Sequence, residues 1–250
     1  MRPRKTMALI LAAAAAVPTM AGCEEKAKSG PEQSESRSFN LSGTTLKVVA
    51  TEAAVQIKAG AGGGIDVKRS VRGEIADGDS AMSLDDGTLH LRATCGGVVK
   101  DCSAKYTVTV PKGVSLNLDG VGSDVTVTGL RNGLTARLSA DASLSANDIA
   151  GTMQLRSDGG DITVKRARAD TVKAVASNDG NVRLSFAEPP RSVEAKSYGG
   201  AVTVVVPTGS ATYRVVTAGN SVGKQLESDP RSSRTISAVA TDGPVSVRKG

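Results

Sequence analysis

The sequence predicts an all-β protein, a parallel β-solenoid of about 20-residue coils with a less regular β region on its N-terminal side. The first observation is a repeat. Residues 153–164, 172–184, 193–204 and 236–247 each hold two short alternating runs joined by a Gly-containing turn, and residues 213–222 hold a degraded copy. The second is composition, since aromatic residues are 2% of the chain and Trp is absent. Alternation puts apolar side chains on one face of a strand, and few bulky residues favour a narrow interior of Val, Leu, Ile and Ala.

Equivalent apolar positions recur in the second strand of every copy. If each coil lies on the one before it, these side chains stack in rows about 4.8 Å apart and fill the interior. Glycines recur two residues earlier, which indicates either a positive φ or a close approach between coils. The predicted row is Val125, Leu144, Ile162, Val182, Val202, Val222 and Val245, and the glycines are Gly160, Gly180, Gly200 and Gly243. Pro244 and the charged C-terminal residues are expected to protect the terminal sheet edge.

The N-terminus has the features of an export signal. Basic residues within positions 1–5 precede an uncharged apolar run at residues 7–17, which is too short to span a bilayer. The following Met20-Ala-Gly-Cys23 resembles the lipobox of bacterial lipoproteins, although Met20 replaces the usual Leu. The resemblance implies cleavage before Cys23 and diacylglycerol on its thiol, which anchors the protein to the outer side of the cell membrane. Cleavage without lipidation is the alternative.

The sequence divides into three parts. Residues 1–22 are predicted to be a lipoprotein signal peptide. Residues 23–38 are polar and nearly devoid of apolar side chains, and are predicted to be a flexible tether. Residues 39–250 are predicted to be a single β-repeat domain, with irregular strands in 39–110 and regular coils in 111–250.

The three cysteines have different expected roles. Lipidation of Cys23 leaves Cys95 and Cys102 as a close pair in an exported protein, and such a pair is expected to form a disulfide. A redox or metal site is disfavoured, because the spacing is not Cys-x-x-Cys and His90 is the sole histidine of the chain. No metal or other cofactor is expected.

The segment after Cys102 resembles a known family. Residues 106–118 form a strand that runs through Val-Pro-Lys-Gly, and residues 122–129 follow with a Gly-Ser-Asp-Val-Thr-Val motif. This pattern resembles the bacterial β-strand-repeat proteins labelled "putative adhesins" (DUF4097). The resemblance implies a stack of β-coils on a lipoprotein or membrane anchor, with an adhesive role, and it carries no catalytic residues.

The predicted function is a surface-tethered, non-enzymatic, adhesin-like module with a binding or structural role in the cell envelope. The alternative is a polysaccharide-cleaving β-helix enzyme, which needs two suitably spaced carboxylates. The candidate carboxylates are Asp158, Asp161, Asp179 and Asp242. Asp158 and Asp179 are expected in turns, where Asp is favoured for local hydrogen bonding. Calcium is disfavoured, because the position of Asp161 becomes Asn181, Ala201 and Ser221 in later copies.

The expected partners are the membrane, through the lipid anchor, and a cell-wall polymer or envelope protein. Tyr198 lies in a turn and is the best candidate for an exposed binding residue, whereas Tyr213 falls in an inward row. Lys165, Arg166 and Arg168 form a local basic cluster that is either a solvated loop or a contact for anionic lipid or wall polymer. The formal charge of +6 is dispersed and there is no aromatic platform, so nucleic acid is not expected as a partner. The ligand and the oligomeric state stay open.

Overall fold

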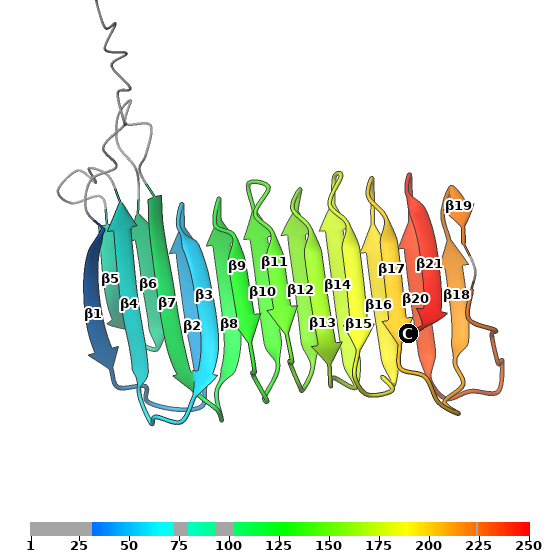
Figure 1. The fold of residues 1–250 in the computed structure, drawn as a ribbon, viewed down its shortest axis with the longest axis horizontal. Coiled ribbons are helices and arrows are strands. Elements are labelled where there is room, and N and C mark those ends of the chain that lie inside the picture. The colour runs from blue at the N-terminus through cyan, green and yellow to red at the C-terminus, as the bar shows by residue number, and fades with distance from the viewer. Residues whose placement is uncertain (1–31, 73–79, 94–102, 224) are drawn as a thin grey trace, which may run out of the picture.

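The computed structural model describes residues 32–72, 80–93, 103–223 and 225–250. Its strands form two long sheets that pack on each other along one axis, so that inward side chains of both sheets share one core (Figure 1). Sheet A contains, in spatial order, β1 (Gln33–Phe39), β4 (Ile65–Arg72), β7 (Ser103–Pro111), β3 (Ala54–Gly60), β9 (Val125–Thr128), β11 (Leu144–Asn147), β13 (Ile162–Ala167), β15 (Val182–Phe186), β17 (Val202–Val206), β21 (Pro244–Lys249) and β19 (Ser221–Val222). Sheet B contains β18 (Arg214–Ala218), β20 (Thr235–Ala240), β16 (Ser192–Ser197), β14 (Thr171–Ser177), β12 (Met153–Asp158), β10 (Leu134–Ser139), β8 (Ser115–Val121), β2 (Thr45–Thr51), β6 (Thr88–Ala93) and β5 (Ser80–Asp85).

The middle of the molecule is the predicted parallel solenoid. From β8–β9 to β16–β17, each coil gives one strand to sheet B and the next to sheet A, and every coil after β8–β9 pairs in parallel with the coil before it. Ile162, Val182 and Val202 lie opposite one another in consecutive strands of sheet A, and each is fully buried. Stacked aliphatic side chains therefore fill the interior, as the repeat predicted.

The repeated glycines allow the coils to approach closely. A Cβ built on Gly180 would lie 2.4 Å from the carbonyl oxygen of Gly160, and one on Gly200 would lie 2.5 Å from that of Gly180. None of these glycines has a positive φ. Of the two explanations that the sequence left open, close approach is therefore the correct one here.

The C-terminal end departs from the predicted stacking order. β20 and β21 insert between β16–β17 and β18–β19 (Figure 1). The coil formed by β18 and β19 is therefore at the end of the stack, although β20 and β21 follow it in the chain. Val245 rather than Val222 is the neighbour of Val202, and Val222 lies beyond Val245. The expected edge role of Pro244 is also wrong, because Pro244 pairs with Ser221 inside the stack and the true edges are β18 and β19.

The N-terminal strands join the same two sheets with a similar exchange. β8 and β9 pair with β2 and β3, while β6 and β7 lie on the far side of β2 and β3. β1, β4 and β5 then add in antiparallel fashion at this end. This mixture accounts for the less regular pattern of the first part of the sequence.

The predicted tether is shorter than expected at its C-terminal boundary. β1 begins at Gln33 and pairs along its length with β4, so residues 33–38 belong to sheet A. The pairing uses backbone groups and polar contacts, including Arg69 with Glu35 at 2.6 Å and Ser38 with Asp66 at 2.7 Å. A strand of this kind lacks the apolar alternation that identified the other strands, which is why composition suggested a flexible segment.

Candidate functional site

Tyr198 lies directly after the C-terminal end of β16, a strand inside sheet B. Because side chains alternate along a strand, the preceding Ser197 points inward and is buried, whereas Tyr198 points out and is 45% exposed. The Lys196 ammonium lies 4.3 Å from the centroid of the Tyr198 ring and donates to its hydroxyl at 3.2 Å. This cation–π contact fixes the ring at the surface. Tyr213, by contrast, is 1% exposed and belongs to the core, as predicted.

A pocket of about 400 Å³ surrounds Tyr198. We call it the Tyr198 pocket. It lies across the turns of neighbouring coils. In one of these turns Asn178 has a left-handed φ of 51° and donates a side-chain hydrogen bond to Asp158 at 3.3 Å. The pocket offers donors and acceptors beside an aromatic ring, a combination suited to a ligand rich in hydroxyl groups. Its other lining residues are Arg156, Ser177, Asp179, Gly199 and Asp242.

A second, smaller hollow of about 170 Å³ adjoins this pocket on the outer face of sheet B. Arg156 lines both, so the two form one continuous surface. We call the second one the arginine hollow, since Arg137 of β10 and Arg156 of β12 form its walls. Lys173 also lines it and is paired with Glu194 at 2.9 Å.

The basic cluster predicted at Lys165, Arg166 and Arg168 does not form one free surface. Lys165 and Arg166 are exposed at the end of β13 in sheet A, where the strand bulges and Arg166 has a φ of 50°. The Arg168 guanidinium is bound to Asp148 at 2.9 Å and to Glu188 at 3.1 Å. The hydrogen bond from Arg168 lowers the pKa of Asp148. Arg168 therefore has a structural role, and the cluster lies on a different sheet from the arginine hollow.

The turn carboxylate Asp161 belongs to a ladder of side-chain hydrogen bonds between coils. Its Oδ1 accepts from the backbone N–H of Asn181 at 2.8 Å, and Asn181 Oδ1 in turn accepts from that of Ala201 at 2.9 Å. Arg183 contacts its other oxygen at 2.6 Å. Burial alone would raise the pKa of Asp161, but the hydrogen bonds from Asn181 and Arg183 together hold it below its ordinary value. The ladder ends at Ala201, whose side chain has no acceptor, and the strand that follows β17 in sheet A is β21 rather than β19.

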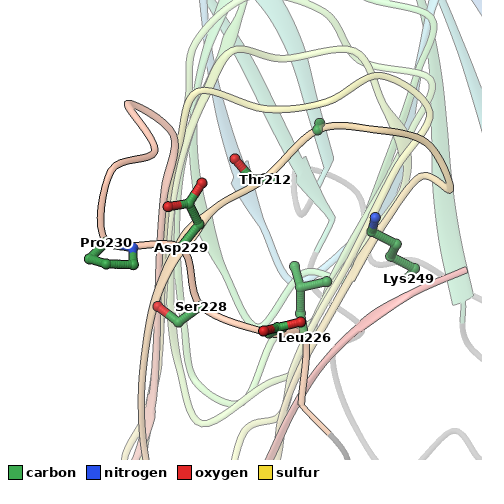
Figure 2. Close-up of a pocket in the computed structure, with 8 residues that line it drawn as sticks. Thr212, Leu226, Ser228, Asp229, Pro230 and Lys249 are labelled. Carbon is green, nitrogen blue, oxygen red and sulfur yellow. The ribbon is translucent and has the colours of Figure 1, made fainter.

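A further pocket of about 400 Å³ lies at the C-terminal end of the solenoid (Figure 2). Its walls are connecting segments and the end of β21, with Asp229 and Lys249 on opposite sides. Two of its charged side chains already bind backbone groups, because Lys249 donates to the Gly209 carbonyl at 2.7 Å and Asp229 accepts from the Arg231 N–H at 2.9 Å. It is therefore a weaker candidate than the Tyr198 pocket. The repeat could not reveal it, because connecting segments do not follow the repeat.

Several predicted features fall on other parts of the chain. Cys23, Cys95 and Cys102 lie outside the described residues, as does the signal peptide. In the described ranges, no three His, Cys, Asp or Glu side chains are arranged to hold a metal ion. The described part of the chain also holds no helical segment with the length and apolar character needed to span a membrane.

The fold and the surface pockets define a two-sheet β-solenoid with its polar site on the outside. The family described as Toastrack DUF4097 matches residues 28–248, and the chain belongs to this family. Two solved structures are similar. A "putative adhesin" from Bacteroides fragilis has 19% identity and a TM-score of 0.51, with 87% of this chain and 97% of that chain covered. A "putative lipid binding protein" from Parabacteroides distasonis has 10% identity and a TM-score of 0.50, with 86% and 96% covered.

At these identities the likeness shows the fold alone. Comparison with curated proteins found no match.

Proposed function

We propose that this protein is a non-enzymatic, adhesin-like binding module, tethered by a lipid on Cys23 to the outer side of the cell membrane. It binds a cell-wall polymer or envelope protein through the outer face of sheet B. The names of the two similar structures, an adhesin and a lipid-binding protein, agree with a binding role. The family supports the same class of function, because its fold presents long flat faces for contact.

The observation that carries this proposal is the position of Tyr198. A half-exposed tyrosine beside a polar pocket of about 400 Å³ is the kind of group that dominates binding surfaces. In the middle coils the interior is filled by stacked aliphatic residues, with Val182 and Val202 fully buried. Binding at the outer surface is therefore the role that this geometry supports best.

The alternative, a polysaccharide-cleaving enzyme, gains no support from the carboxylates. A glycosidase acid needs a raised pKa, whereas the hydrogen bonds from Asn181 and Arg183 hold the pKa of Asp161 below its ordinary value despite its partial burial. Asp161 is bound in structural contacts between coils, and Asp158 accepts a hydrogen bond from Asn178 of the next coil. We therefore do not offer cleavage as a second function.

The binding role can be tested with the full chain in detergent and isolated envelope material. Tyr198→Ala should weaken binding at least several-fold, because truncation of an aromatic anchor removes more than about 1 kcal/mol. Val222→Ala is the matched control, since Val222 is also exposed but belongs to sheet A. Equal binding by both variants and the unchanged chain would exclude this face as the contact surface.

The anchor has its own test. Cys23→Ser should move the protein from the membrane fraction to the soluble extracytoplasmic fraction, because the lipid needs the thiol. Retention of the variant in the membrane would count against lipidation. If Cys95 and Cys102 form the expected disulfide, an alkylating reagent should modify neither cysteine unless the protein is first reduced.

A further inference from the structure

Two cations face each other on the outer surface of sheet B. Arg137 of β10 lies opposite Arg156 of β12 in the parallel register. Neighbouring strands are about 4.8 Å apart, and like charges directly opposite are destabilising. Among the registered strand pairs of the described residues, this is the one place where two like charges meet. Stability alone gives no reason for this arrangement.

The acidic side chains close to this pair are already engaged. Asp119 lies opposite Arg137 in β8 but contacts Lys47 at 3.4 Å, and Glu194 contacts Lys173 at 2.9 Å. Neither arginine forms an ion pair or a side-chain hydrogen bond with another described residue. The guanidinium donors are therefore free for a ligand.

The arginine hollow has the donors that an acidic group requires. Each guanidinium presents a planar fork of N–H groups that matches a carboxylate or phosphate in bidentate fashion. Thr135 and Gln154 add neutral hydrogen-bonding groups to the same hollow of about 170 Å³. Arg156 also lines the Tyr198 pocket, so an extended ligand can cross from one to the other.

We propose that this surface binds an acidic polysaccharide, with a carboxylate or phosphate group on Arg137 and Arg156 and a neighbouring sugar ring against Tyr198. The inference rests on the binding role proposed above and names its ligand class. An anionic membrane fits less well, because Asp179 and Asp242 line the adjoining pocket and would repel a continuous negative surface. A polysaccharide carries its negative charges at separate positions, so its hydroxyl groups can lie against Asp179 and Asp242 while an acidic group binds the arginines.

The test measures the affinity of the full chain for two acidic polymers, polygalacturonate and phosphomannan, against methyl-esterified polygalacturonate and unphosphorylated mannan. The informative variant is Arg137→Gln/Arg156→Gln. Lys165→Gln/Arg166→Gln is its matched control, because it removes the same charge from exposed positions of sheet A. We expect the unchanged chain to prefer at least one acidic polymer by about tenfold or more over its neutral form. The arginine variant should lose about tenfold in that affinity, and the control less than about twofold.

Thermal melting distinguishes loss of the site from loss of folding. The arginine variant should melt no lower than the unchanged chain, since it removes the repulsion between two opposed cations. Equal loss of affinity in both variants would mean diffuse charge attraction and would overturn the proposal. Arginine-dependent binding to phosphatidylglycerol vesicles, without binding to either polymer, would replace it with a membrane contact. If the chain binds envelope material but neither acidic polymer, the ligand class is wrong while the binding role stands. If it binds neither the envelope material nor the polymers, the ligand class and the binding role are both wrong.

Discussion

The middle coils and the two ends of this solenoid follow the same repeat but stack by different rules. From β10–β11 to β16–β17, each coil lies directly on its predecessor in the chain. At the C-terminal end two consecutive coils exchange places, and at the N-terminal end β2–β3 lies between β6–β7 and β8–β9. The repeat therefore specifies the register of neighbouring coils, but not which coils become neighbours.

The exchange at the C-terminal end has a physical reason. Any coil with aliphatic side chains in the shared rows can rest on any other, so register alone does not choose between them. The inward positions of β20 and β21 hold Ile236, Ala238, Val245 and Val247, whereas the matching positions of β18 and β19 hold Val215, Thr217 and Val222, one of which is polar. The coil with more apolar surface takes the inner position, because burial stabilises it by about 25 cal/mol per Å².

Truncation should give the largest effect and tests the stacking order directly. Deletion of residues 234–250 removes three large buried aliphatic side chains, at roughly 1.5–3 kcal/mol each, and leaves β18 and β19 without a strand to pair with. We expect it to melt close to a chain that lacks residues 207–250. If the shorter deletion melts well above the longer one, β18 and β19 stabilise the fold without β20 and β21, and their dependence on these two strands is contradicted.

A buried charge in a middle coil should be nearly as damaging. Val182→Asp places an unpaired carboxylate between two coils, and we expect a loss of more than about 3 kcal/mol in the free energy of unfolding. Val216→Asp is the control on the terminal coil, where the side chain is 58% exposed and the loss should stay below about 0.5 kcal/mol. Urea unfolding measures both, and similar losses would contradict the assigned faces.

Close coil contact predicts a smaller loss at Gly180. Gly180→Ala puts a Cβ 2.4 Å from the Gly160 carbonyl oxygen, closer than the 3.0 Å below which real Cβ contacts essentially never occur, so the coils must separate, at about 1–3 kcal/mol. Gly62→Ala has no atom within 4 Å of the new Cβ and should be neutral. An unchanged melting temperature for Gly180→Ala would mean that the middle coils are looser than described.

The polar ladder predicts the smallest and most pH-dependent effect. Asp161→Ala removes the acceptor for the Asn181 N–H and should cost about 1 kcal/mol, whereas Asp161→Asn keeps an acceptor, as Asn181 does one coil further on. Because the folded-state pKa of Asp161 is lowered, its charge stabilises the fold above the ordinary value of 3.8, and this contribution is lost as the pH falls through the lowered pKa. The difference in the free energy of unfolding between the unchanged chain and Asp161→Asn should therefore disappear at acidic pH. A gap that stays constant with pH would contradict the role of the charge.

The sequence predicted the solenoid, its inward rows and the glycine positions, because each of these follows from a local pattern. Ile162, Val182 and Val202 are in register as expected. The exchanged coils were not predictable in this way, since Val222 and Val245 are equally suitable neighbours for Val202. β1 was missed because its strand is held by polar pairing rather than by an apolar face.

The candidate site could be predicted in part. The alternation of β16 places Tyr198 outside, and the structure agrees. Arg137 and Arg156 are 19 positions apart, one coil of the repeat, so an alignment of the copies could have found them as a pair. The cluster of Lys165, Arg166 and Arg168 looked stronger because its members are adjacent in the chain, but sequence adjacency does not show that Arg168 is bound to Asp148 and Glu188.

The inner position of the final coil also constrains the order in which the molecule can fold. In a chain synthesised from its N-terminus onward, residues 207–223 are made before β20 and β21, the strands with which β18 and β19 pair. The native contacts of β18 and β19 therefore form only after these later strands have been made.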